Sequence, residues 1–347
     1  MNQFEKQFLN PAETSAEEQS WRDLEKIIDE LAARSPYKRA TASPTTEIIS
    51  ARDEKDAKFS ELGDLKIEQV KDPASPKVEG IVNFMNKFEP EEADPPEIIR
   101  DAIADPTGIY AYHIIENKAG EVIAHNQSSY LELEPPGEDE EASQAIIFNG
   151  FVITADDAQR KGLASELYQT MMRCHLEKAK AEGQEVKAIV AEGDADSEAF
   201  LNSVGLRRIY FEDNDGHWRE LPYLQPPIEW NKRTGMPKGW KEGDDLKEFC
   251  IPENLMIRRV DGQQEMTMDE LRPMLETIYL DNYVPYRNEG ERYPTDKAIA
   301  KAQEIVDGFQ QELEDAVSQA KDGKLYLFDA QEREQKMAEA KAGGREF

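Results

Sequence analysis

The stretch Phe151-Val-Ile-Thr-Ala-Asp-Asp-Ala-Gln159-Arg-Lys-Gly162-Leu-Ala-Ser-Glu-Leu167 decides the fold. It reads as an apolar strand, a short polar turn and the start of a long helix, which we expect over 160–182. Gly162 allows the backbone of the turn to approach a ligand without a Cβ clash. Backbone N–H groups at a helix N-terminus favour an anion. We therefore predict an anion-binding turn, and a plain helix start with a chance glycine is the alternative.

Outward from this stretch, apolar periodicity predicts a mixed α/β domain. The expected elements are a strand at 65–70, helices at 76–88 and 96–104, strands at 110–116, 122–131 and 145–154, the helix at 160–182, a strand at 186–191, a short helix at 197–204 and strands at 206–211 and 255–260. The core domain is therefore expected at 64–262.

Two segments flank this core. Residues 1–63 are expected to form a helical extension and linker, in which Ser15 caps a helix that ends at Pro36. Residues 263–347 are expected to form a C-terminal helical extension, with polar residues 331–347 frayed. Each extension carries an apolar helical stripe, which either docks on the core or binds a partner; for the C-terminal stripe that partner could be a second subunit in a homodimer.

Composition excludes several classes of function. The chain has 42 Lys and Arg against 72 Asp and Glu, a net charge of −30, which disfavours binding to nucleic acid or to an anionic membrane. No apolar run approaches the roughly 20 residues that span a bilayer, and the N-terminus does not have the layout of a signal peptide. Two cysteines and four scattered histidines predict neither a disulfide framework nor a metal site. A cytoplasmic, acidic globular protein is expected.

The turn, in this order of elements, resembles the Q/R-x-x-G-x-G/A loop of the GNAT (Gcn5-related) N-acetyltransferases. The strand at 186–191 and the segment Ser197–Leu206 also resemble that family. The resemblance covers residues 65–211, and it extends to residue 260 if 255–260 is the closing strand. It implies acetyl-CoA as co-substrate and a backbone strand that binds its pantetheine arm, at Val152, Ile153 and Thr154. It also implies that the pyrophosphate is held by the turn, at Gln159, Arg160, Lys161, Gly162, Leu163 and Ala164.

The resemblance implies that the amine of the acceptor attacks the thioester directly, while a base removes the ammonium proton. Glu192, at the end of a strand, is the candidate base, and Glu140 and Glu141 are further candidates. Leu201 stands where the family carries a tyrosine acid, so either Tyr210, Ser203 or a water protonates the thiolate, or no acid is needed because a CoA thiol is a tolerable leaving group. A plain surface role is the alternative for Glu192, and a non-catalytic acyl-CoA-binding or protein-interaction module is the alternative for the whole chain.

The sequence says least about the identity of the amine acceptor. Six acidic residues between 132 and 141 form either an ordinary solvated loop or an acidic rim that attracts a cationic amine. A polyamine, an aminoglycoside-like molecule or a basic peptide would suit such a rim. Asn149, Tyr112 and His125 are expected to line the acceptor side, unless they are simply core residues.

Overall fold

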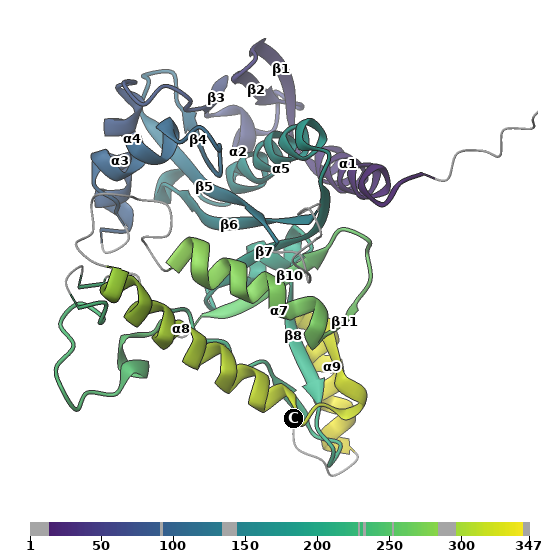
Figure 1. The fold of residues 1–347 in the computed structure, drawn as a ribbon. Coiled ribbons are helices and arrows are strands. Elements are labelled where there is room, and N and C mark those ends of the chain that lie inside the picture. The colour runs from purple at the N-terminus through teal and green to yellow at the C-terminus, as the bar shows by residue number, and fades with distance from the viewer. Residues whose placement is uncertain are drawn as a thin grey trace, which may run out of the picture.

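The computed structural model describes residues 14–90, 93–133, 144–227, 230–231, 234–251, 253–283 and 296–342. One mixed sheet runs through these residues, with helices on both of its faces (Figure 1). Its strands are β1 (Tyr37–Ser43), β2 (Thr46–Ala51), β3 (Leu65–Gln69), β4 (Tyr110–Glu116), β5 (Val122–Glu132), β6 (Gln144–Thr154), β7 (Glu185–Gly193), β8 (Arg207–Glu212), β9 (Trp218–Glu220), β10 (Asn254–Arg259), β11 (Glu265–Thr267) and β12 (Lys324–Phe328).

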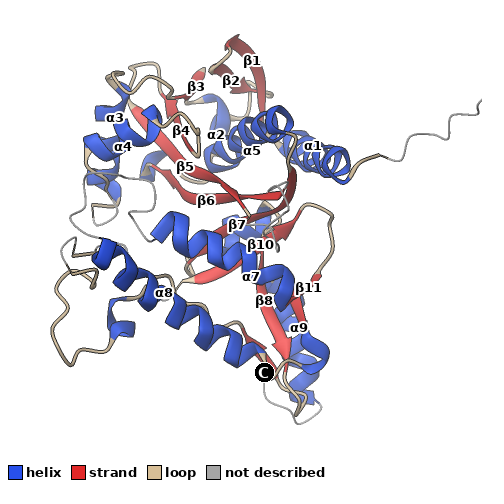
Figure 2. Cartoon of the chain, viewed as in Figure 1, coloured by secondary structure: helices blue, strands red, loops and turns tan. Residues whose placement is uncertain are grey.

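Helices are interspersed with the strands along the chain and are drawn in blue in Figure 2. They are α1 (Ala16–Arg34), α2 (Ala57–Ser60), α3 (Lys77–Phe88), α4 (Pro96–Ala104), α5 (Leu163–Glu182), α6 (Glu198–Ser203), α7 (Met268–Thr277), α8 (Asp296–Val317) and α9 (Ala330–Ala342). From β3 to β8 this order confirms the expected strand, two helices, three strands, helix, strand, helix and strand.

The strand order across the sheet is β1-β2-β3-β4-β5-β6-β7-β10-β8-β12-β11, and β9 pairs with β8. Among the described strands, only the neighbours β6 and β7 pair in parallel, because α5 carries the chain back to the starting edge between them. The strand expected at 255–260 is present as β10, which lies between β7 and β8. The expected mixed α/β fold is confirmed in its core.

One face of the sheet is covered by α5, α1 and α6. Helix α1 begins where the sequence predicts, because the Ser15 hydroxyl accepts a hydrogen bond from the Glu18 N–H at 3.2 Å. Its apolar stripe, which includes Leu24 and Leu31, packs on α5 and β7, and Figure 1 shows α1 beside α5. The N-terminal stripe therefore docks on its own core.

The opposite face is covered by α3 and α4 at one end and by α7 and α8 at the other. The expected capping box at the start of α7 is present, since Thr267 and Glu270 exchange hydrogen bonds. The apolar seam of α8, from Ala302 to Val317, is buried in the same cluster as α7 and β10. The C-terminal stripe is thus used within the chain.

The two extensions differ from expectation because both contribute strands to the sheet. Residues 37–51, expected as linker, form the β1–β2 hairpin, whose Ile49 packs with β3 and α5. Residues 330–342, expected to fray, form α9, and Arg333 of this helix makes an ion pair with Glu198 at 3.0 Å. The sheet is therefore continuous across residues 63 and 262, where the sequence suggested boundaries.

Candidate active site

The site begins where β6 and β7 part. Their parallel pairing stops at Asn149 and Ala191, although both strands continue. Beyond that point β6 pairs with β5 as far as Thr154, and β7 pairs with β10 as far as Gly193. Between Gly150 and Thr154, the edge of β6 that faces β7 has no strand partner in the described parts of the chain. This opening includes Val152, Ile153 and Thr154, the segment expected to bind a pantetheine arm.

The turn expected to bind the anion follows directly. Gly162 has φ +78° and is the N-cap of α5, and Arg160 also has a positive φ, of 59°. None of the backbone N–H groups of Arg160 to Ala164 donates a hydrogen bond to any described residue. The Gln159 N–H does donate, to the Asp156 carbonyl at 3.4 Å. The available donors therefore begin at Arg160, one residue later than the sequence suggested.

Charge around the turn is nearly balanced. Lys161 makes an ion pair with Glu61, so that its charge is offset by the N-terminal extension. Arg160 is exposed, and its guanidinium makes no ion pair with the residues that the structure describes. Asp156 and Asp157 are exposed just before the turn. An anion here would be held mainly by backbone amides and by Arg160.

Glu192 is the first residue of β7 beyond the end of its pairing with β6. Its carboxylate accepts a hydrogen bond from the Tyr223 hydroxyl. Tyr223 stacks at a tilt on Tyr279, with ring centroids 5.8 Å apart, and the Tyr279 hydroxyl donates to the Leu224 carbonyl at 3.1 Å. Burial, reinforced by the Glu192 charge, raises the pKa of Tyr279. A carboxylate and a tyrosine hydroxyl thus meet where the two strands part.

Tyr210 lies elsewhere. Glu192 pairs with Leu255 of β10, and Leu255 packs in one cluster with Ile209. Tyr210, the next residue, therefore points to the opposite face, where its ring stacks on Phe328 at 5.4 Å. Burial raises its pKa. The structure does not bring Glu192 and Tyr210 together.

Tyr223 was missed as a site residue by sequence reasoning. It is separated from Glu192 by a strand, a helix and a loop, and no periodic pattern connects the two. Leu201, which stands at the usual tyrosine position of the family, is buried in the core, where its Cδ1 would lie 2.4 Å from a Cβ placed on Gly193. Position 201 therefore supplies no acid to the site.

The three residues expected to line the acceptor side are all buried, and they divide between the two faces. Tyr112 stacks on His125, with centroids 6.1 Å apart, and Tyr112 packs with α3 and α4. Asn149 accepts a hydrogen bond from the Asn126 amide at 2.7 Å. Asn126 shares a face with Ser128, whose hydroxyl lies 2.8 Å from His175 of α5. Glu140 and Glu141 lie outside the described residues.

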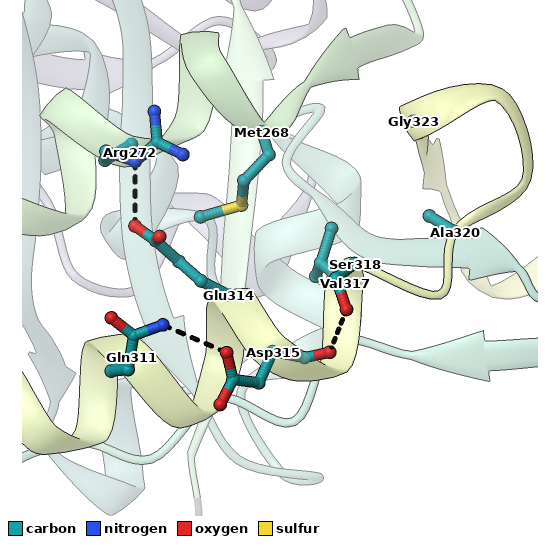
Figure 3. Close-up of a pocket in the computed structure, with 9 residues that line it drawn as sticks. All are labelled: Met268, Arg272, Gln311, Glu314, Asp315, Val317, Ser318, Ala320 and Gly323. Atoms are coloured by element: carbon teal, nitrogen blue, oxygen red, sulfur yellow. Dashed lines mark hydrogen bonds and ion pairs between the residues drawn. The ribbon is translucent and has the colours of Figure 1, made fainter.

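We also searched the described residues for a metal site, a membrane-spanning helix and a second pocket. Within the described ranges, no group of three or more His, Cys, Asp or Glu side chains could hold a metal ion. No helix in that part of the chain is long and apolar enough to cross a membrane. A hollow of about 460 Å³ lies between α7 and α8 (Figure 3). Its charged groups are already paired, as Arg272 and Glu314 are at 2.8 Å, and it contains none of the candidate residues.

A buried ion pair ties the N-terminal extension to the first turn of α5. Glu166, whose side chain is fully buried, accepts hydrogen bonds from Arg39 Nε at 3.0 Å and from the Ser35 hydroxyl, and it makes an ion pair with Arg39 Nη2 at 2.8 Å. Arg39 also donates to Thr170 at 2.8 Å. The carboxylate is thus compensated mainly by residues of the extension, which lie more than 120 positions away, and a longer hydrogen bond of 3.5 Å comes from Gln169 of α5.

We expect Arg39→Met to lower the free energy of unfolding by about 3–5 kcal/mol, because it leaves a buried charge without its partner. Urea denaturation measures this loss. The double variant Arg39→Met/Glu166→Gln, which removes both charges, should recover part of it. A loss below about 1 kcal/mol in the single variant would contradict the assignment.

Comparison with known proteins gives a fold-level likeness only. No family model matches the chain, and no curated protein matches it. Among solved structures, it is similar to aminoglycoside N-acetyltransferase AAC(6')-Iy in complex with CoA, with 13% identity over 41% of this chain and 86% of that one and a TM-score of 0.31. GCN5 from Tetrahymena is 12% identical over 56% of this chain and 95% of that one, with a TM-score of 0.31.

A protein from Desulfovibrio desulfuricans, described as an acetyltransferase of the GNAT family, is 10% identical over 56% of this chain and 99% of its own, with a TM-score of 0.31. Two of the three, AAC(6')-Iy and the Desulfovibrio protein, are acetyltransferases by description. Because the identities and TM-scores are low, we base no residue role on them. The site is defined by the chain's own geometry.

Proposed function

We propose that the protein is an acyl-CoA-dependent N-acyltransferase that transfers an acetyl group from acetyl-CoA to a primary amine. The observation that carries this proposal is the set of unpartnered amides from Arg160 to Ala164, placed at the mouth of the opening between β6 and β7. Amides at a helix start suit a diphosphate. The free edge of β6 next to them suits an extended chain that pairs as a strand does.

The chemistry would take place at the end of the opening. A pantetheine arm lying along Val152 to Thr154 would point its thioester toward the place where Glu192 and Tyr223 meet. Glu192 would accept the proton of the attacking ammonium, and Tyr223, hydrogen-bonded to it, is the hydroxyl best placed to protonate the leaving thiolate. Positioning of the amine in line with the thioester would supply much of the remaining rate. Tyr223 replaces Tyr210 in this proposal.

The acceptor would approach from the face that carries α7 and α8, since Glu192 points to that face. A cationic amine suits an acidic chain whose reactive carboxylate stands beside two tyrosine rings. Polyamines, aminoglycosides and basic peptides are the acceptors to screen first.

Acetyl-CoA binding by the purified protein tests the donor site. A Gly162→Asp variant tests it poorly, because at φ +78° any side chain is strained and a Cβ would lie 3.3 Å from Pro36. Arg160→Glu is cleaner, since Arg160 is exposed. Calorimetric titration should show at least tenfold weaker binding in Arg160→Glu, because a like charge then faces the diphosphate.

Arg22→Glu is the matched control, because it makes the same charge change at an exposed arginine of α1. It should bind acetyl-CoA as the wild type does. Equal weakening in both variants would indicate a general charge effect rather than a site at the turn. Absence of binding to the folded wild type would overturn the proposed function, and binding without turnover of any amine would favour an acyl-CoA-binding module.

A further inference from the structure

The N-terminal extension contacts the turn itself, in addition to α5. The Tyr37 hydroxyl donates a hydrogen bond to the Lys161 carbonyl at 2.7 Å. Pro36 and the Tyr37 ring lie 3.3 and 3.7 Å from the position of a Cβ on Gly162. Residues 36 and 37 therefore form one wall of the turn, although they are more than 120 positions away in the sequence.

The hydrogen bond from Tyr37 fixes the direction of an amide. In a trans peptide the carbonyl of one residue and the N–H of the next point in opposite directions within one plane. By holding the Lys161 carbonyl, Tyr37 turns the Gly162 N–H away from itself. The turn needs such support, because Arg160 and Gly162 on either side of Lys161 both have positive φ, and a non-glycine residue adopts that conformation only with a cost in energy.

Tyr37 is itself firmly held. Its side chain is 1% exposed, and its ring packs edge-on against Phe59 with centroids 6.0 Å apart. Its N–H donates to the Ser35 hydroxyl at 2.9 Å, and that hydroxyl donates to buried Glu166. The burial also raises the pKa of Tyr37, so that its hydroxyl stays a hydrogen-bond donor through the physiological range.

We propose that Tyr37 is a positioning residue of the donor site, which orients the Lys161–Gly162 peptide so that the Gly162 N–H and the amides after it point toward the diphosphate of acetyl-CoA. This inference rests on the proposed function. It makes the N-terminal extension a structural part of the donor site, and it assigns Tyr37 no contact with the reacting atoms.

The test compares Tyr37→Phe with Tyr130→Phe. Tyr130 is equally buried, but its hydroxyl has no hydrogen-bond partner among the described residues. Loss of one neutral hydrogen bond predicts about fivefold to tenfold weaker acetyl-CoA binding in Tyr37→Phe and wild-type binding in Tyr130→Phe. In steady-state assays, KM for acetyl-CoA should rise while kcat and KM for the amine stay unchanged.

An acetyl donor without a diphosphate distinguishes an effect of Tyr37 on the turn from an effect on the fold as a whole. S-acetylpantetheine lacks the diphosphate, so Tyr37→Phe and the wild type should bind it equally at millimolar concentration.

Equal weakening for both donors would show that Tyr37 acts through the fold, and unchanged acetyl-CoA binding would show that it does not orient the turn; each result overturns the inference but leaves the proposed function. No binding of acetyl-CoA by the wild type overturns both.

Discussion

Glu192→Gln should lower kcat for acetyl transfer by about 10² to 10⁴, the usual contribution of a general base, with little change in the Kd for acetyl-CoA. Glutamine keeps an oxygen that can accept the hydrogen bond from Tyr223, so the local geometry is preserved while the proton acceptor is removed. The measurement is the rate of CoA release with an acceptor found by screening amines, together with calorimetric titration of the donor.

Glu177→Gln provides the matched control, because Glu177 is an exposed carboxylate on α5 whose nearest cation, Lys180, is 4.0 Å away. It should retain wild-type kinetics. A rate for Glu192→Gln within about threefold of wild type, far less than a general base contributes, would show that another group, or water alone, accepts the proton.

Mild acid should destabilise the protein steeply. Burial lowers the pKa of His113 to about 3, of His125 to about 4 and of His175 to about 3, against about 6.5 in the unfolded chain. Above pH 6.5 these histidines are neutral in both states and contribute nothing to the pH dependence. Below it the unfolded chain binds protons that the folded chain cannot, so stability is lost as the pH falls from about 6.5 toward 4.

Each such histidine contributes a slope of about 1.4 kcal/mol per pH unit, and the three together about 4 kcal/mol per pH unit. Urea unfolding at several pH values between 6 and 5 measures this slope. His175→Gln can still hydrogen-bond Ser128 and should reduce the slope by about a third. A flat profile in the wild type would contradict the buried, neutral state.

The sequence predicts the local elements of this protein well and their lateral arrangement poorly. The strand, turn and helix around Gly162 follow from apolar periodicity and one glycine, which are signals within a few residues. The position of β10 between β7 and β8 depends on pairings between residues that are 48 to 71 positions apart, for which local pattern carries no information. The β1–β2 hairpin was missed for a different reason: its strands are close in sequence, but the segment Tyr37–Ser43 is mostly polar and exposed and gives no apolar pattern.

The candidate site likewise contains one part that lies within a single stretch of sequence and one part that joins distant segments. The donor turn lies within one stretch and was predicted, whereas the Glu192–Tyr223 pair joins two distant segments. Tyr210 was a reasonable candidate by distance along the chain, but the alternation of side chains in β8 places it on the other face. The contacts of Tyr37 with the turn bring together residues 37 and 161, a relation that no spacing in the sequence expresses.

The continuous sheet has a consequence for biosynthesis. Strand β8 acquires its partner β12 only when residues 324–328 have been made, and the apolar side of β10 is covered by helices that follow it in the chain. A nascent chain that ends near residue 262 would expose an unpaired strand edge and a large apolar surface. Pairings this distant also form slowly, and such intermediates aggregate readily. The protein should therefore complete its core only after synthesis is nearly finished, and it should depend on chaperones until then.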